Sequence, residues 1–168
     1  AICGKTPRYG LHLSENRAPT ALIDVGFEPG FTSDFGALGW LVGKSVKNGI
    51  PYFSGLGDPG TDQLKSLGAA MAASGAVALY HVEDATPESG RFETEGLERI
   101  TIEREDIEKA YSELGGQNDP DIIVIGCPHA SVDEIRKIAS LLEGKTLKKP
   151  LWVCTSRPVR EAVVKMGL

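Results

Sequence analysis

Residues 121–142 read DIIVIGCPHASVDEIRKIASLL and contain a strand, a loop and a helix in direct succession. The run from Asp121 to Ile125 is apolar without strict alternation, which is typical of a strand that is buried on both faces. Ser131 and Glu134 have the spacing of a capping box, so a helix is expected from Ser131 to Leu142. A buried strand followed by a helix is the repeating unit of a parallel α/β sheet.

The same alternation of strand and helix extends over most of the chain. Apolar runs predict strands at 21–25, 50–53, 76–82, 100–102 and 151–154, and apolar residues at helical spacing predict helices at 33–47, 61–73, 105–114 and 158–166. We therefore predict the α/β class, as a three-layer α/β/α arrangement around a mostly parallel sheet. A single domain over residues 1–168 is expected.

Composition limits the class of protein. The chain has 168 residues, 41% of them hydrophobic and 24% charged, as in ordinary folded domains. Its net charge of −5 argues against a nucleic-acid partner. No apolar run reaches the roughly 18 residues that a membrane helix needs, and no signal-peptide pattern is present, so no membrane association is expected. Three cysteines favour reduced thiols and a cytoplasmic location over a disulfide framework.

The ends of the sequence suggest a part of a longer protein. The chain begins AICG without Met, and a cluster of functional residue types starts at Cys3 with no element before it. The other end stops where a helix would lead into another strand. We interpret the sequence as a fragment of a longer catalytic chain, and a processed mature chain is the alternative.

Four loops are expected at the carboxyl edge of the sheet, where wound parallel sheets bind their ligands. They span residues 54–58, 81–84, 126–129 and 154–157 and contain two of the three cysteines and two of the three histidines. Helices are expected to begin after Ser131 and Ser156, where free N–H groups and the helix dipole suit an anion. Arg157 follows the second of these positions and is a further candidate for anion binding.

Cys127 is the residue best suited to metal chemistry. It follows a predicted strand and precedes a helix, and a thiolate near the start of a helix can bind iron or zinc. A buried, inert cysteine is the alternative. Cys154 ends a predicted strand and is expected in the core, whereas Cys3 is undecided. Because the chain has no CxxC pair, a closed zinc finger is disfavoured.

Residues 3–17, which we call the opening segment, read CGKTPRYGLHLSENR and concentrate ionisable side chains. Lys and Arg can hold carboxylate or phosphate groups, Arg through its planar fork of donors. Lys5, Arg8 and Arg17 are therefore candidate anion-binding residues. A solvated surface loop with the same composition is the alternative.

A second reading of the sequence is a nucleotide-binding domain. Residues 55–60, GLGDPG, satisfy the pattern G-x-G-x-x-G between a predicted strand and a predicted helix. However, Pro59 removes one N–H, and no acid lies at the expected distance of about 20 residues. A Gly-rich turn in which Asp58 and Pro59 start a helix is therefore preferred.

A third reading is a non-catalytic module that docks a partner. Residues 83–98 contain six acids and one base and are expected to form a long surface loop, whereas residues 131–168 contain eight bases and four acids. The basic end, which includes Lys148 and Lys149, could contact an acidic partner. A solvated basic helix surface explains the same charges.

Four motifs, taken in order along the chain, resemble the catalytic (large) part of the aconitase X family. They are residues 3–20 (CGKTPRYGLHLSENRAPT), 33–39 (SDFGALG), 126–131 (GCPHAS) and 155–157 (TSR). The resemblance extends over nearly the whole chain. It implies an aconitase-like fold and a hydro-lyase that dehydrates a small hydroxy acid, such as mevalonate 5-phosphate or cis-3-hydroxy-L-proline. Abundant basic residues favour the phosphorylated substrate.

The resemblance also implies a cofactor, a partner and roles for particular residues. An iron–sulfur cluster held by three cysteines is implied, with Cys127 as a ligand, together with a small swivelling subunit or domain that provides a catalytic Ser. The small anionic hydroxy-acid substrate would be held by Lys5, Arg8, Arg17, Ser131, Ser156 and Arg157. Proton handling would fall to His12, Glu15 and His129. Because parts of the family's large chain are missing here, the fragment alone is expected to be inactive and to lack a complete cluster.

Overall fold

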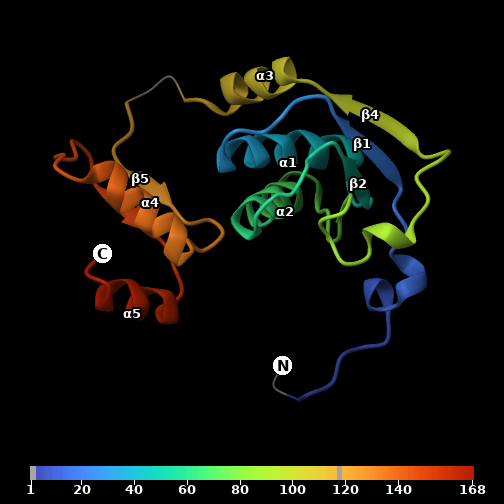
Figure 1. Ribbon diagram of the computed structural model, residues 1–168, viewed down its shortest axis with the longest axis horizontal. Helices are drawn as coiled ribbons and strands as arrows, with labels where there is room; N and C mark the ends of the chain where they lie inside the picture. Colours follow the sequence, from blue (N-terminus) through green and yellow to red (C-terminus); the bar gives the residue numbers. More distant parts are fainter. Residues whose placement is uncertain (1–2, 117–118) are drawn as a thin grey trace. The chain divides into compact units, whose positions relative to one another are not determined.

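The computed structural model describes residues 3–116 and 119–168, which form two compact units (Figure 1). Unit 1 extends to Glu113 and unit 2 begins at Leu114. All paired strands in both units are parallel, and helices follow them, so the predicted α/β class with a mostly parallel sheet is confirmed for the described residues. The sequence predicted one sheet in one domain, whereas each unit has a sheet of its own.

The sheet of unit 1 has four strands in the order β3-β2-β1-β4. They are β1 (Ala21–Val25), β2 (Pro51–Ser54), β3 (His81–Val82) and β4 (Glu98–Ile102). β1 is hydrogen-bonded to β2 on one side and to β4 on the other. The strand predicted at 76–82 is shortened to two residues, because the register places Tyr80 opposite Pro51, which has no N–H to donate.

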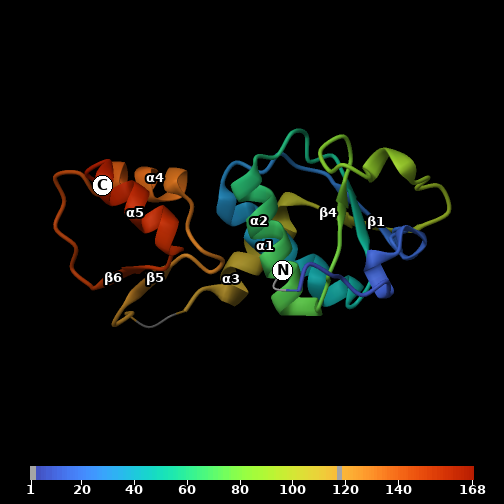
Figure 2. The ribbon, with the colours of Figure 1, turned by 90° about the horizontal axis from the view of Figure 1, so that it is seen from below.

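Three helices pack against one face of this sheet (Figure 2). They are α1 (Thr32–Val46), α2 (Thr61–Gly75) and α3 (Arg104–Leu114). On this face the side chains of Val82, Phe53, Ile23 and Ile100 form a row that crosses all four strands in register. This row and the apolar residues of the helices form one core cluster. Burial of this apolar surface makes the largest favourable contribution to the folding free energy of unit 1.

The opposite face of the sheet is covered by irregular segments instead of helices (Figure 2). Its row in register is His81, Tyr52, Leu22 and Arg99. His81 is buried, while Arg99 at the other end of the row is exposed and pairs with Asp24. The covering segments contain the 3-10 helices η1 (Gly10–His12), η2 (Ser14–Asn16) and η3 (Ser89–Arg91). The opening segment and the predicted loop 83–98 therefore meet on this face.

Glycines allow α1 and α2 to approach closely. A Cβ atom at Gly39 would collide with the backbone carbonyl of Leu67, and one at Gly75 would collide with the backbone of Gly43. Backbone atoms cannot move aside as a flexible side chain can. These glycines therefore set the distance between the two helices, which explains why the motif at 33–39 ends in Gly39.

Asp34, in the first turn of α1, is a buried carboxylate with several hydrogen-bond donors. It accepts hydrogen bonds from the N–H of Gly30 at 2.8 Å and from the hydroxyl of Tyr111 at 2.8 Å, and Arg104 lies at 3.4 Å. Burial raises the pKa of Asp34, but the bonds from Tyr111, Gly30, Phe31 and Arg104 outweigh burial and hold this pKa below its ordinary value. Asp34 thus joins the start of α1 to α3.

Unit 2 contains two parallel strands and two helices. They are β5 (Ile123–Ile125), β6 (Leu151–Val153), α4 (Val132–Leu142) and α5 (Arg157–Lys165). The capping box predicted at the start of α4 is confirmed, since the Ser131 hydroxyl accepts from the N–H of Glu134 at 3.1 Å. Val124 and Trp152 are paired in register and are both exposed. In neither unit do the described residues form a helix with the length and apolarity required to cross a bilayer.

Replacement of Gly39 by Ala is expected to destabilise the full-length protein by about 1–3 kcal/mol, because the added methyl group overpacks the contact with α2. Gly36→Ala is the matched control in the same helix. Its Cβ atom would lie 3.2 Å from the hydroxyl oxygen of Ser66, a side chain that can rotate away. Urea unfolding measures both. Equal stability of the two variants would contradict the proposed packing constraint.

Replacement of Asp34 by Asn is expected to lower the free energy of unfolding by about 1–3 kcal/mol at pH 7. Because the folded-state pKa of Asp34 is lowered, its stabilisation is complete above the unfolded value of about 3.9 and is lost as the pH falls through the folded value. The deficit of the variant should therefore shrink in acid.

Asp24→Asn is the control for this experiment. Asp24 belongs to an exposed ion pair with Arg99, whose loss should cost less than about 1 kcal/mol. Thermal or urea unfolding between pH 3 and pH 7 provides the comparison. An Asp34→Asn deficit that is independent of pH would show that the carboxylate charge does not stabilise the fold.

Candidate functional site

The Gly-rich loop after β2 lines a cavity of about 410 Å³ at the carboxyl edge of unit 1. Glu28 and Asp58 line this cavity, and none of the described residues that line it is a Lys or Arg. The N–H of Gly60, at the start of α2, already donates to the side chain of Gln63 at 2.6 Å. A polyphosphate would meet like charge here, so the geometry favours the Gly-rich turn over the nucleotide-binding reading.

The opening segment folds into a compact block between Tyr9 and Arg17. The N–H of Leu13 donates to the carbonyl of Gly10 at 3.1 Å, and the side-chain amide of Asn16 donates to the same carbonyl at 2.9 Å. The Nε of Arg17 donates to the carbonyl of Leu11 at 2.6 Å. Local hydrogen bonds therefore fix the conformation of this part of the segment.

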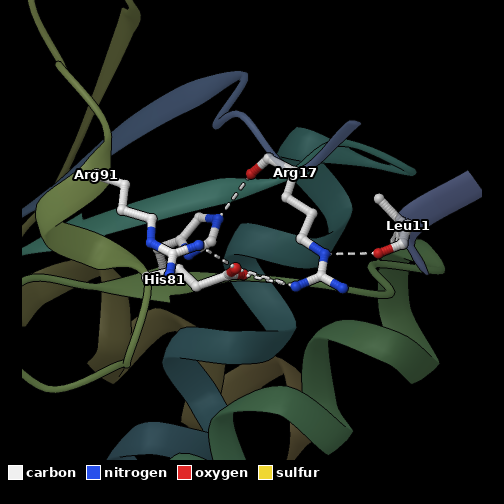
Figure 3. Close-up of polar contacts among 5 residues, drawn as sticks. Leu11, Arg17, His81 and Arg91 are labelled. Carbon is white, nitrogen blue, oxygen red and sulfur yellow. Dashed lines mark hydrogen bonds and ion pairs between the residues drawn. The ribbon is translucent and has the colours of Figure 1, made fainter. Parts of the chain in front are cut away.

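An ion-pair cluster joins the block to residues 83–98 (Figure 3). The Nη1 atom of Arg17 lies 3.0 and 3.1 Å from the two carboxylate oxygens of Glu88. Arg91 also donates to this carboxylate, at 3.1 Å. The side chains of Arg17 and Glu88 are only 29% and 20% exposed, so solvent screens this pair less than a surface pair.

His81 provides the second contact to Arg17. Its Nε2 atom lies 2.8 Å from the backbone carbonyl oxygen of Arg17 (Figure 3). A carbonyl oxygen can only accept, so this ring nitrogen bears the proton. The ring is 1% exposed and lies against Phe92, with ring centroids 4.6 Å apart. Packing and the hydrogen bond together leave the imidazole one orientation.

The other ionisable residues predicted in the opening segment are exposed. The side chains of Lys5, Arg8, His12 and Glu15 have no hydrogen-bond or ion-pair partner among residues 3–116 and 119–168. Arg17 differs from them, because its Nε and Nη1 atoms are already engaged. The structure thus separates the predicted anion-binding set into an anchored arginine and free side chains that an external ligand can reach.

In unit 2 the loops after β5 and β6 are hydrogen-bonded to each other. The carbonyl of Cys154 accepts from the N–H of Ala130 at 2.9 Å, and the hydroxyl of Thr155 donates to the carbonyl of Ala130 at 2.6 Å. Gly126 has a φ of +103°, and a Cβ atom there would collide with the carbonyl of Cys154. Gly126, directly before Cys127, therefore packs against the backbone at the end of β6.

Both thiols of unit 2 are free and exposed. The expectation that Cys154 lies in the core is therefore wrong, and its physical reason is that β6 belongs to a two-stranded sheet whose strand ends lie at the surface. Cys3, in the opening segment, is also free and exposed. Within the part of the chain that is described, no three or more His, Cys, Asp or Glu side chains are arranged to hold a metal ion.

The remaining predicted residues of unit 2 lie at the same strand ends. Ser131 and Ser156 both cap helices, since the hydroxyl of Ser156 accepts from the N–H of Val159 at 3.4 Å. His129 and Arg157 are exposed on the two loops. Lys149, part of the basic end, pairs with Asp119 at 2.7 Å.

Sequence reasoning missed Glu88 and Arg91 as parts of a site, and it placed His81 on a ligand-binding loop without a role, whereas the structure places it in β3. Glu88 and His81 contact Arg17 across 71 and 64 positions of sequence, so no local pattern predicts either contact. One signal was available, because a basic opening segment and an acidic stretch at 83–98 have complementary charges. These charges predict that the two segments attract each other, but they do not predict which residues form the ion pairs.

Two family models match the chain. The first, described as the aconitase X second domain, matches residues 19–112, and the other, described as the aconitase X third domain, matches residues 120–168. The gap between the two matches includes the division between unit 1 and unit 2. Together they cover most of the chain.

Similar proteins include named enzymes and a solved structure. The phosphomevalonate dehydratase large subunit of Methanothermobacter thermautotrophicus is 52% identical over 99% of this chain and 42% of its own length. The cis-3-hydroxy-L-proline dehydratase of Pseudomonas aeruginosa is 33% identical over 86% of this chain and 27% of its own length. A crystal structure of Thermococcus kodakaraensis aconitase X (holo-form) is similar with a TM-score of 0.92 and 46% identity, over 99% of this chain and 44% of that one. The chain thus spans less than half the length of these relatives.

Proposed function

Because the chain belongs to the aconitase X family, we propose that it forms part of the large subunit of a hydro-lyase that dehydrates mevalonate 5-phosphate. The observation that supports this substrate is the 52% identity, over 99% of the chain, to a relative named phosphomevalonate dehydratase large subunit. Identity to a relative named cis-3-hydroxy-L-proline dehydratase is 33%. That second hydroxy acid is the alternative substrate.

The free cations of the opening segment suit a substrate with two anionic groups. Mevalonate 5-phosphate has a carboxylate and a phosphate, whereas cis-3-hydroxy-L-proline has a carboxylate alone. We assign Lys5 and Arg8 to these groups because both side chains are exposed and have no partner among the described residues. In Arg17 the Nε and Nη1 atoms are engaged by Leu11 and Glu88, while Nη2 contacts none of the described residues and is assigned to an anion. We also assign Arg157 as an anion-binding residue, because its guanidinium is exposed.

The helix starts of unit 2 add a second kind of anion binding. Ser131 and Ser156 begin α4 and α5, and the first N–H groups of a helix favour negative charge. The two serine hydroxyls already accept hydrogen bonds from their own helices, at Glu134 and Val159. We therefore assign these serines an indirect part in substrate binding, in which they orient the helix ends whose N–H groups face the anion.

Dehydration requires two events on neighbouring carbons. A proton leaves one carbon and a hydroxide leaves the next, so the enzyme needs a base, an acid and a means of stabilising the departing oxygen. We assign His12, Glu15 and His129 to proton handling. All three are exposed, and the side chains of His12 and Glu15 have no described partner, so solvent and substrate can both reach them.

The family implies an iron–sulfur cluster, and the thiols of unit 2 fit part of its ligand set. Cys127 and Cys154 are free, exposed and located on two loops that are hydrogen-bonded to each other. Thiolates are the usual ligands of such clusters, and when bound the cluster supplies a Lewis acid for the leaving hydroxyl. We assign Cys127 as one ligand, with Cys154 suited to the same role by its position. Further ligands would come from the rest of the full-length protein.

The protein is proposed to act with a small subunit. Its relatives are named large subunits, a term that implies a smaller partner in the same enzyme. We place the catalytic Ser expected for the family on that partner and the assembled enzyme in the cytoplasm. This chain would then require the rest of the large subunit and its partner for activity.

The substrate assignment predicts that the full-length protein, assembled with its small subunit, consumes mevalonate 5-phosphate and releases water. Loss of substrate and formation of the unsaturated product can be followed by mass spectrometry. cis-3-Hydroxy-L-proline, at the same concentration, should react at least about 100-fold more slowly, because the phosphate contacts are absent. The reverse preference would make the alternative substrate correct. Inactivity toward both would overturn the proposal.

The ligand assignment predicts that Cys127→Ala binds less iron. After anaerobic reconstitution of the full-length protein with iron and sulfide, the variant should lose most of the visible absorbance and bound iron of the wild type. Ser140→Ala, an exposed position on α4, is the control and should reconstitute normally. Equal iron content in Cys127→Ala and the wild type would exclude Cys127 as a ligand.

A further inference from the structure

We propose that Glu88 is a positioning residue for substrate binding. It holds the opening segment in the place where the segment's free side chains, among them Lys5 and Arg8, reach the substrate. This proposal rests on the function proposed above, because it assigns Glu88 a part in that same site. Glu88 does not itself touch substrate and acts through Arg17.

The opening segment is joined to the rest of the described chain by the polar contacts of one residue, Arg17. Among residues 3–116 and 119–168, every hydrogen bond or ion pair between the opening segment and later residues involves Arg17. Its carbonyl meets His81 and its guanidinium meets Glu88. The remaining polar contacts of the segment are internal to it.

Arg17 in turn fixes the position of the turn that contains Leu11. Its Nε atom donates to the carbonyl of Leu11 at 2.6 Å while Nη1 of the same guanidinium meets Glu88 (Figure 3). The guanidinium is planar and rigid, so fixing one of its edges orients the other. Glu88 therefore orients the turn that contains His12, although the two residues do not touch.

The carboxylate of Glu88 is itself held in place by neighbouring residues. Arg91 donates to its carboxylate from the other side, and the hydroxyl of Ser89, a buried residue, donates to the carbonyl of Thr86 at 2.9 Å. Phe92 packs on the ring of the buried His81. The carboxylate is thus presented from a short ordered turn and lines, with Arg17 and Arg91, a cavity of about 500 Å³.

The contact between Glu88 and Arg17 differs from an ordinary surface ion pair. Both side chains are less than one-third exposed, and the single carboxylate is paired with two guanidinium groups. Without the charge of Glu88, Arg17 would face Arg91 in a partly buried place, and repulsion would move the arginine and the turn that it holds. Among the described residues, Arg17 would then keep one polar contact to a later residue, the hydrogen bond between its backbone carbonyl and His81.

The experiment compares Glu88→Gln and Glu88→Ala in the full-length protein assembled with its small subunit. Gln has the size of Glu and removes the charge alone, so the fold is preserved even if the Ala variant is not stable. Glu93→Gln is the matched control, since Glu93 is an exposed acid of the same stretch and has no described partner. Kinetics with mevalonate 5-phosphate and cleavage by trypsin after Arg8 are measured on each.

We expect Glu88→Gln to raise KM about tenfold, with kcat changed less than about twofold, because binding contacts are displaced while the chemistry of the bound substrate is kept. Trypsin should cleave after Arg8 at least about threefold faster, since the segment opens more often. Glu88→Ala should show larger changes in the same direction. Glu93→Gln should match the wild type in both measurements.

Wild-type values of both KM and cleavage rate in Glu88→Gln would overturn the proposal. A fall in kcat at unchanged KM, or faster cleavage without a change in KM, would also overturn it, because Glu88 would then be catalytic in the first case and merely structural in the second. If the wild-type enzyme has no activity on mevalonate 5-phosphate, the proposed function fails. The cleavage rates then still decide whether Glu88 holds the segment.

Discussion

The alternation of side chains along β1 is the constraint on which unit 1 depends. β1 is paired on both sides, so a residue on this strand can point only toward the helices or toward the opposite face. Ile23 points toward the helices and belongs to the core cluster, while Leu22 lies in the row that ends in His81. Because all three helices occupy the first face, the second face is left to irregular segments that bear ionisable side chains.

Much of the fold could be predicted from the sequence because its signals are local. The apolar run at 21–25, the helix periodicity of α1 and the capping box at Ser131 each involve residues a few positions apart, and each is present in the structure. The split into two sheets could not be predicted in the same way. It depends on which strands pair, and short apolar strands of both units look alike in sequence.

The candidate site shows the same limit. Residue types alone predicted anion binding by the opening segment and by Arg157, and metal binding by Cys127. Burial and pairing were beyond reach, so Cys154 was expected in the core, although it is exposed. The long stretch at 83–98 was interpreted as a surface loop, yet Ser89 within it is buried and Glu88 meets Arg17. Such contacts arise only when distant segments cover the same face.

Arginine suits position 17 because its guanidinium can donate hydrogen bonds to two different acceptors at once. A lysine could meet Glu88, but its single ammonium group could not at the same time form a planar, oriented contact with the carbonyl of Leu11. The one carboxylate of Glu88 therefore positions a whole turn while it pairs only with the two arginines beside it. Lys5 and Arg8 keep their charge unpaired among the described residues. A segment held by all its cations would be more rigid, but it would have none left for an anionic ligand.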